Sequence, residues 1–378
     1  MNTEGAIRAA YLSRKRIQGL THGVYRYPAR FSPEFVRACV DEFTKPGDLV
    51  LDPFVGAGTS AIESLASGRR FAGFDINPLA ILLTRAKTTP LYPADRLALT
   101  RWLDQPFQSS SVPLAPDERL RNAPADLVDA LTPLVRQVSL LPSPRQRDAA
   151  QAVLLQACQW AVDGRTEPAT PAQLISAVRE ALVGLLEGIE DLKSTARGAG
   201  VNPSSLPRRR VLRTGPSEAA ARHPGANRLA GRGMLVVTSP PYPGVHVLYH
   251  RWQVRGRAET PMPYWLADLQ DGLGPKHYTM GGRTAVGQAQ YFEAMRSTWL
   301  AIRRLLHPAA IVVQLVAFTD PDQQLERYQE MMSQAGYERA AELEPDGWRP
   351  VPNRRWYIRV QPNKGLGREI LLTHRVSR

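Results

Sequence analysis

The stretch Leu49–Thr59 reads LVLDPFVGAGT and joins a short apolar run to a turn that contains two glycines. An apolar run of this length, bounded by turn residues, is typical of a strand buried inside a parallel sheet. A second apolar run, Val236–Val237, leads directly into TSPPY at residues 238–242. Ligands of open α/β sheets bind beyond the carboxyl ends of the strands, so we expect both loops to line one crevice.

Alternating strand and helix patterns surround these two loops. Ser32, Pro33 and Glu34 supply an N-cap, a first-turn proline and a first-turn acid, which predicts a helix over the apolar positions of 35–43. Further helices are expected at about 60–67, 291–306 and 323–335, strands at 71–74, 210–213, 234–237 and 310–316, and extended runs at 356–360 and 369–372. The alternation predicts an α/β fold with a mainly parallel sheet.

Residues 91–206 have a different character, because strand signals vanish there and helical periodicity takes over. One amphipathic helix is marked by Leu127, Leu131, Leu134, Val135 and Val138, and another by Leu174, Val178, Leu182, Leu185, Leu186 and Ile189. We therefore predict a helical insertion at 91–206, within a sheet domain that is formed by residues 1–90 and 207–378.

The charge of the chain is unusual for a globular protein. Its 378 residues carry a formal net charge of +13, and the pI is near 10.1. Such an excess attracts polyanions, of which nucleic acid is the commonest.

Cysteine content and hydropathy indicate the cellular compartment and exclude some classes of protein. Cys39 and Cys158 have no paired spacing, which excludes a disulfide framework and a cysteine zinc site and suits a reducing cytoplasm. No metal site is expected. No apolar stretch is long enough to span a membrane, and the N-terminus lacks a secretory signal pattern, so we expect a cytoplasmic protein.

The glycine loop has the residues that a nucleoside cofactor needs. Gly56 and Gly58 permit positive φ and close backbone approach to a ligand. Asp75 follows Gly58 by 17 residues, at the end of the next strand, where a carboxylate can accept hydrogen bonds from ribose hydroxyls. Asp52 would repel a pyrophosphate but suits an ammonium group. S-adenosylmethionine combines an ammonium group, a ribose and an adenine, and we predict it as the cofactor.

Four motifs occur together in this chain: YPARFxP at 27–33, DPFxGxGT at 52–59, GFDINP at 73–78 and SPPY at 239–242. They resemble the motifs of the S-adenosylmethionine-dependent DNA amino-methyltransferases, in the form associated with cytosine-N4 methylation. The resemblance covers residues 21–90 and 208–375 and leaves the helical insertion uncovered. It implies a Rossmann-like methyltransferase sheet with a helical insertion, and a site-specific enzyme of DNA methylation such as restriction-modification systems use.

The resemblance also implies which residues form the site. The cofactor would be held by Phe31, Asp52, Pro53, Phe54, Gly56, Gly58, Thr59, Asp75, Ile76, Asn77 and Thr238. The catalytic residues would be Ser239, Pro240, Pro241 and Tyr242.

The second loop suits transfer to an exocyclic amino nitrogen, which is a poor nucleophile because its lone pair is delocalised into the ring. Ser239 Oγ and the Pro240 carbonyl would accept the amino hydrogens and direct the lone pair at the sulfonium methyl. Tyr242 would stack on the flipped base. Methylation of carbon 5 needs a cysteine nucleophile, whereas both cysteines of this chain are expected on helix faces as small apolar residues.

Other functions remain as alternatives. Adenine-N6 methylation of DNA is the first, because a serine at position 239 does not exclude adenine. A methyltransferase that acts on guanine-N2 of RNA or on a protein glutamine would share the cofactor loop but would usually have Asp or Asn before the two prolines and the tyrosine. A non-catalytic DNA-binding protein on the same fold is disfavoured by the intact Asp52, Asp75, Ser239 and Tyr242.

Double-stranded DNA is the expected partner. The polar stretch 243–288 supplies the predicted DNA contacts Arg251, Trp252, Arg255, Arg257 and Arg283. The helical insertion is the other candidate for reading sequence, and in that role it would close over DNA from the side opposite this loop. The alternative role for the insertion is a stabilising cap or a dimer surface. A partner restriction endonuclease and the oligomeric state are left open by the sequence.

Overall fold

The computed structural model of this chain describes residues 3–13, 18–27, 31–104, 116–243, 251–256, 258–272, 278, 280–282, 284–318, 320–344, 349–350 and 368–377. At its centre is a sheet with the strand order β3-β2-β1-β4-β7-β10-β8. These strands are β1 (Leu49–Asp52), β2 (Arg70–Asp75), β3 (Arg210–Thr214), β4 (Gly233–Thr238), β7 (Leu306–Val316), β8 (Tyr337–Arg339) and β10 (Arg368–Val376). Neighbours pair in parallel, except that β10 is antiparallel to β7 and β8. A short β9 (Arg349–Pro350) also pairs with β10.

The strand order reverses direction at β1. From this strand the chain adds β2 and β3 on one side, and β4 and β7 on the other. In a doubly wound sheet such a reversal leaves a crevice beyond the strand ends, because the two neighbouring connections leave toward opposite faces. The predicted α/β, Rossmann-like fold is therefore confirmed, and the predicted run 356–360 lies outside the described residues.

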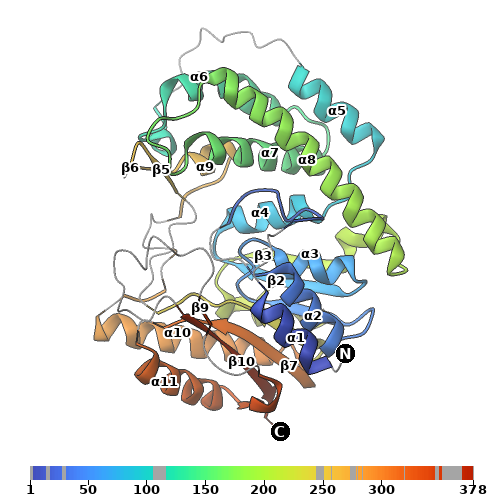
Figure 1. Ribbon diagram of the computed structural model, residues 1–378, viewed down its shortest axis with the longest axis vertical. Coiled ribbons are helices and arrows are strands. Elements are labelled where there is room, and N and C mark those ends of the chain that lie inside the picture. Colours follow the sequence, from blue (N-terminus) through green and yellow to red (C-terminus); the bar gives the residue numbers. More distant parts are fainter. Residues whose placement is uncertain are drawn as a thin grey trace.

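Alternation along the strands sends side chains to two separate apolar cores. Val50, Phe71 and Leu235 share one core with α2 (Pro33–Phe43) and α3 (Thr59–Ala66). Leu51, Ala72 and Val236 are the intervening residues and share the other core with α10 (Ala285–Arg303) and α11 (Pro321–Gln334). Figure 1 shows the sheet between these two helix layers, with α1 (Thr3–Leu12) beside α2.

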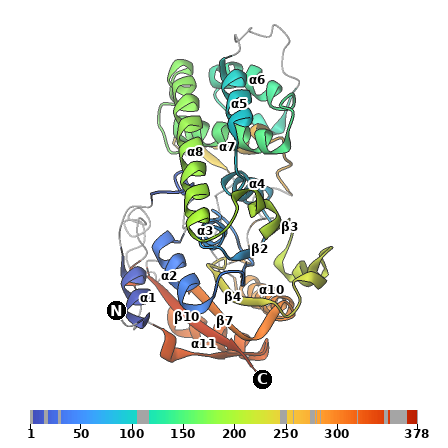
Figure 2. The ribbon, with the colours of Figure 1, turned by 90° about the vertical axis from the view of Figure 1, so that its right-hand side faces the viewer.

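The connection from β2 to β3 holds a set of helices at one end of the molecule. Its described helices are α4 (Pro78–Lys87), α5 (Pro93–Asp104), η1 (Glu118–Leu120), α6 (Ala125–Val138), α7 (Pro144–Val162), α8 (Pro171–Gly198) and η2 (Pro203–Arg209). Ser143 and Thr170 begin α7 and α8 with capping boxes, each followed by a first-turn proline. Figure 2 shows α8 running from this helical layer down to α3.

The stretch predicted as a polar loop contains ordered elements that the sequence analysis missed. Strands β5 (Trp252–Val254) and β6 (Ala258–Thr260) form a hairpin, which α9 (Met262–Leu266) follows. Gly164 N–H donates to the Gln253 carbonyl at 2.9 Å, and Gln151 Nε2 donates to the Ala267 carbonyl at 2.7 Å. This part of the chain thus packs on the helices of the insertion, which corrects the expectation that the two would approach DNA from opposite sides.

Short 3₁₀ helices lie in other connections of the sheet. The connection between β3 and β4 contains η3 (Ser217–Arg222) and η4 (Ala226–Arg228), and η6 (Ala341–Leu343) follows β8.

Within the described ranges, no helix combines the length and apolarity that a membrane span requires. The same ranges hold no group of three or more His, Cys, Asp or Glu side chains placed to bind a metal ion.

Candidate active site

The ends of β1 and β4 meet at the reversal point of the sheet. Asp52, the last residue of β1, accepts a hydrogen bond from Thr238 Oγ1 of β4 at 2.6 Å on its Oδ1 atom. The same oxygen accepts from Phe54 N–H at 3.0 Å, and Oδ2 accepts from Ser60 Oγ. One buried carboxylate therefore ties the glycine loop to the strand that carries the TSPPY motif.

Burial of Asp52 has an electrostatic consequence. Removal from water raises the pKa of this carboxyl to about 6, against the lowering effect of hydrogen bonds from Ser60, Thr238 and Phe54. Three hydrogen bonds leave about one of the four lone-pair positions of a carboxylate for another donor. An ammonium group has the charge and the hydrogens to use that position.

The glycine loop has the backbone conformation that its sequence predicts. Gly56 has φ +48° and Gly58 has φ +77°, and Gly58 is the N-cap of α3. A Cβ at Gly58 would lie 2.5 Å from Thr84 Oγ1, so the loop rests directly on α4. A Cβ at Gly56 would come no closer than 3.5 Å to its nearest neighbour among the described residues, the ring of Tyr27.

Asp75 holds the same loop from the neighbouring strand. Its Oδ2 accepts from Gly56 N–H at 2.8 Å, and its Oδ1 accepts from Asn77 N–H at 2.8 Å. Burial raises the pKa of this carboxyl to about 6, while the two backbone hydrogen bonds lower it and the nearby Asp52 adds to the rise. Each oxygen keeps a lone pair for a further donor. A carboxylate at a strand end, next to an accessible glycine backbone, fits the ribose of a nucleoside cofactor.

The other predicted cofactor residues lie around these two carboxylates. The Pro53 carbonyl accepts from Ser217 Oγ, and Thr59 is the first residue of α3. Ile76 is half-buried, and Asn77 caps α4 by accepting from Leu79 N–H at 3.0 Å.

Phe31 and Tyr27 come from the YPARFxP motif at residues 27–33. Phe31 is buried, and its ring lies 5.8 Å from that of Phe35 at the start of α2. Tyr27 is also buried and contacts the Gly56 position. Residues 28–30 lie outside the described residues.

The TSPPY loop presents a half-buried hydroxyl beside an aromatic ring. Ser239 Oγ donates to the Leu315 carbonyl of β7 at 3.1 Å and lies 3.3 Å from the Tyr242 hydroxyl oxygen. The Tyr291 hydroxyl of α10 donates to the Pro241 carbonyl at 2.9 Å, and this hydrogen bond fixes the rigid Pro240–Pro241 turn against α10. Because the serine proton is directed at Leu315, a lone pair of Oγ is left to accept a hydrogen bond.

The predicted DNA contacts have three different outcomes. Trp252 is 1% exposed and donates to the Tyr25 hydroxyl at 3.1 Å, so its prediction as a DNA contact is corrected. Arg251 is buried in an ion pair with Asp271, at 2.5 Å between Nη2 and Oδ2. Arg255 is exposed at the hairpin turn, with φ +46°. Arg257 and Arg283 lie outside the described residues.

Two tyrosines near the site were missed by sequence analysis. Tyr264 of α9 lies with its hydroxyl oxygen 3.4 Å from Asn77 Oδ1, and its ring stacks on Tyr278 with 6.3 Å between centroids. These contacts bring α9 and Tyr278 to the loop that follows β2. The aromatic density of PMPYWL at 261–266 was the available signal for a buried element.

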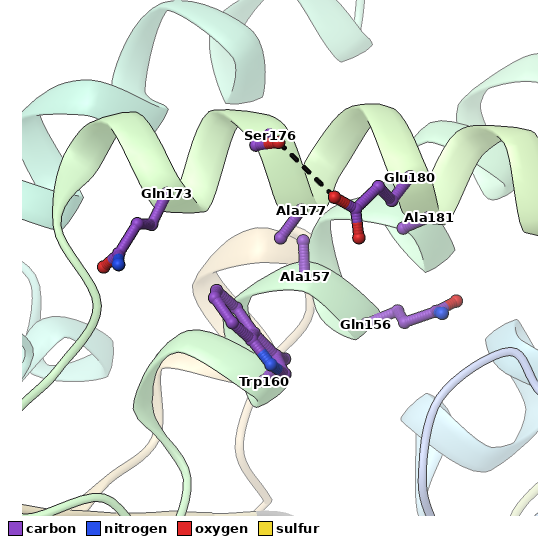
Figure 3. Close-up of a pocket in the computed structure, with 8 residues that line it drawn as sticks. All are labelled: Gln156, Ala157, Trp160, Gln173, Ser176, Ala177, Glu180 and Ala181. Atoms are coloured by element: carbon purple, nitrogen blue, oxygen red, sulfur yellow. Dashed lines mark hydrogen bonds between the residues drawn. The ribbon is translucent and has the colours of Figure 1, made fainter.

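A pocket of about 400 Å³ lies away from this site, between α7 and α8 (Figure 3). Gln156 and Trp160 of α7 and Ser176 and Glu180 of α8 are among the side chains that line it. Trp160 is 47% exposed there. Of the eight residues that line it, Glu180 alone carries a charge, whereas two carboxylates, Asp52 and Asp75, lie at the strand ends, so we place the chemistry at the reversal point.

Comparison with known proteins points to one family for the N-terminal part of the chain. The DNA methylase family matches residues 8–85, which include the glycine loop and Asp75. The type II methyltransferase M.MvaI of Kocuria varians is 42% identical over 78 residues, which make up 20% of this chain and 17% of that protein. The DNA adenine methyltransferase YhdJ of Escherichia coli is 32% identical over 85 residues, 22% of this chain and 29% of that protein.

The reach of these similarities is short. The matched stretch spans less than a third of the length of either relative. Among solved structures, the rRNA methyltransferase AviRa of Streptomyces viridochromogenes aligns over 98% of this chain and 96% of its own, with 12% identity and a TM-score of 0.37. A TM-score this low does not establish a common fold, so we assign the fold from the strand order described above.

Proposed function

We propose that this chain is a DNA methyltransferase that transfers a methyl group from S-adenosylmethionine to the N4 amino group of a flipped cytosine. The observation that carries this proposal is the Thr238–Asp52 hydrogen bond at 2.6 Å. It joins two loops that lie 186 positions apart in the sequence, and it puts the glycine loop and Ser239 at one reversal point of the sheet. The similarity of residues 8–85 to DNA methylases supports the choice of nucleic acid.

S-adenosylmethionine would supply an electrophilic sulfonium methyl group. Asp75 would accept the ribose hydroxyls with the lone pairs that Gly56 and Asn77 leave free. Asp52 would attract the ammonium group of the methionine part, and Phe31 and Tyr27 would cover the nucleoside.

Ser239 would prepare the nucleophile. Its hydroxyl proton is engaged by the Leu315 carbonyl, so Oγ can accept a hydrogen from the exocyclic amino group. Together with the Pro240 carbonyl, this withdraws the amino hydrogens from the plane of conjugation and frees the nitrogen lone pair for the methyl carbon. The nitrogen would form a bond to the methyl carbon as the carbon–sulfur bond of the sulfonium breaks. The electron pair of that bond would be left on sulfur as the thioether S-adenosylhomocysteine, and the nitrogen would then release a proton to water. Tyr242 would provide the surface on which the flipped base stacks, an interaction of about 1–3 kcal/mol.

Adenine N6 is the second candidate acceptor. The similarity to a protein named DNA adenine methyltransferase favours it, at 32% identity over 85 residues. Adenine and cytosine both offer an exocyclic amino group beside a ring nitrogen, so the same two acceptors would serve either base.

Parallel transfer of labelled methyl groups to duplex DNA, tRNA and protein tests the proposed substrate class. We expect label in duplex DNA alone, and loss of that label in Ser239→Ala. Label in tRNA or protein with none in DNA would contradict the proposal. A restriction endonuclease with the same recognition sequence is a candidate partner for a methyltransferase of this type.

A further inference from the structure

Residues 22–27 contact both the sheet region and the helical layer. At one end of this segment, Nε2 of the buried His22 lies 2.6 Å from Oε1 of Glu63 on α3. At the other end, the buried ring of Tyr27 would lie 3.5 Å from a Cβ placed at Gly56 of the glycine loop. The residues between these two ends determine where the Tyr27 ring lies.

One side chain of the helical layer binds both backbone polar groups of Arg26. Gln159 of α7 is buried, and its Oε1 accepts from Arg26 N–H at 2.8 Å while its Nε2 donates to the Arg26 carbonyl at 2.7 Å. A side-chain amide that binds in this way satisfies the donor and the acceptor of one residue together, as a neighbouring strand would. Arg26 therefore cannot move away from α7 without the loss of two hydrogen bonds.

The residue before Arg26 has a backbone conformation that its side chain disfavours. Tyr25 has φ +61°, in the left-handed region, which bulky residues seldom adopt. Such a conformation persists only where the surrounding structure fixes it. Here the indole N–H of Trp252 on β5 donates to the Tyr25 hydroxyl at 3.1 Å, and both side chains are buried. Contacts with the helical layer and the β5–β6 hairpin thus fix this turn against its local preference.

We propose that Gln159 is a positioning residue for the cofactor, because its two hydrogen bonds to Arg26 keep the next residue, Tyr27, over the glycine loop. This inference rests on the proposed function, since it requires that S-adenosylmethionine binds at that loop. A ring that covers a bound nucleoside must move before the ligand can leave. The effect of Gln159 therefore falls on the dissociation rate, and the helical layer takes part in holding the cofactor.

The dissociation rate of labelled S-adenosylmethionine, measured by a chase with excess unlabelled ligand, tests this role. Gln159→Leu keeps the approximate size of the side chain but loses both hydrogen bonds, and we expect dissociation to become about 10-fold faster. The association rate should stay within about threefold of the original. Gln159→Glu keeps the acceptor for Arg26 N–H and loses the donor to the carbonyl, so its dissociation rate should be intermediate.

A double-mutant cycle with Tyr27→Ala distinguishes positioning from general support of the fold. If Gln159 acts through Tyr27, Gln159→Leu in the Tyr27→Ala background should change neither affinity nor dissociation rate by more than about twofold. The matched control is Gln146→Leu, which replaces another buried glutamine of α7, whose Nε2 donates to Asp95 at 2.8 Å. It should lower the melting temperature and leave both rates unchanged.

Three results would overturn the inference. An unchanged dissociation rate in Gln159→Leu would mean that the contact with Arg26 has no effect on the cofactor. Equal increases with tyrosine and with alanine at position 27 would mean that Gln159 does not act through Tyr27. Failure of both Gln159 variants to fold, judged by thermal unfolding, would make Gln159 a structural residue. Failure of the unsubstituted chain to bind S-adenosylmethionine would count against the proposed function itself, so the two failures are distinguishable.

Discussion

The helices between β2 and β3 differ in charge from the rest of the chain. Residues 91–206 contain 11 Lys and Arg against 13 Asp and Glu, whereas residues 207–378 contain 25 against 14. The positive excess of the protein therefore lies outside the helical segment. Phosphate binding depends on Lys and Arg, so we expect the sheet region and its loops to hold DNA. The helices of this segment would serve as the rigid support on which the β5–β6 hairpin packs.

The two regions also differ in the use of buried polar groups. At the reversal point, Asp52, Asp75 and Ser239 keep lone pairs that a ligand can use. In the helical segment, the carboxylate of the buried Asp148 of α7 is occupied by structural contacts, because Arg85 of the neighbouring α4 donates two hydrogen bonds to it at 2.5 and 2.6 Å. Substitutions at the reversal point and at Asp148 should therefore affect different measurements.

The largest effect is expected at Ser239. Ser239→Ala removes the acceptor for the amino group but leaves the glycine loop intact, so methyl transfer should slow by about 100- to 1000-fold. The affinity for S-adenosylmethionine should stay within about threefold of the original. Single-turnover transfer and calorimetric titration measure the two quantities. A large loss of cofactor affinity would show that the two loops cannot be separated in function.

Asp75 comes next. Asp75→Ala removes the hydrogen bond from Gly56 N–H together with the proposed hydrogen bonds from the ribose, and we expect S-adenosylmethionine to bind about 10- to 100-fold more weakly. Asp148→Ala is the comparison in the helical segment. It should lower the melting temperature and leave cofactor affinity unchanged in the protein that remains folded. Unchanged affinity in Asp75→Ala would remove the ribose assignment.

Acid pH should weaken cofactor binding through the same carboxylates. Asp52 and Asp75 have pKa values of about 6 in the free chain, and an ammonium group or ribose hydroxyl favours their ionised forms. Affinity should thus rise with pH up to about 6 and level off above it, with proton release on binding near pH 6. Titration in two buffers of different ionisation enthalpy measures this release, and its absence would mean that neither carboxylate meets the ligand.

Folding stability should have the opposite dependence on pH. The folded pKa values lie above the ordinary carboxyl value of 3.8, so between about pH 4 and 6 the folded chain binds more protons than the unfolded chain. The contribution of these two groups to stability therefore falls as the pH rises through this window. Thermal unfolding of the chain and of Asp75→Asn across the window would show the difference.

The smallest effect concerns DNA. Arg255 is exposed at the hairpin turn, and Arg255→Ala should weaken duplex binding by a few-fold and reduce the salt dependence by about one phosphate contact. Arg179→Ala on α8 is the matched control, because Arg179 is an exposed arginine of the helical segment that pairs with Asp104. We expect no change there. Equal losses of duplex affinity in Arg255→Ala and Arg179→Ala would contradict the proposed difference between the sheet region and the helical segment.

Local patterns were enough to predict much of the fold and of the site. The strand ends at Asp52 and Asp75 could be located because apolar runs stop at special residues, glycine and proline above all. Ser32, Pro33 and Glu34 indicated the start of α2 for the same reason. Such signals depend on a few neighbouring residues, so one sequence is sufficient to read them.

Contacts between distant segments could not be predicted in this way. Three-residue strands such as β5 and β6 show no periodicity, so a hairpin was mistaken for a loop and Trp252 for a DNA contact. The approach of Tyr264 to Asn77 joins residues 187 positions apart. The contact of Gly58 with Thr84 depends on how α4 packs against the glycine loop, which no local pattern indicates.

The most direct measurement is the identity of the methylated nucleoside. DNA from cells that produce this chain, and from cells that produce Ser239→Ala, would be digested to nucleosides and separated by chromatography with mass detection. The account predicts N4-methylcytosine in the first sample and its loss in the second. N6-methyladenine without N4-methylcytosine would contradict the cytosine assignment, and no methylated base in either sample would contradict the proposal that the reversal point is a DNA methylation site.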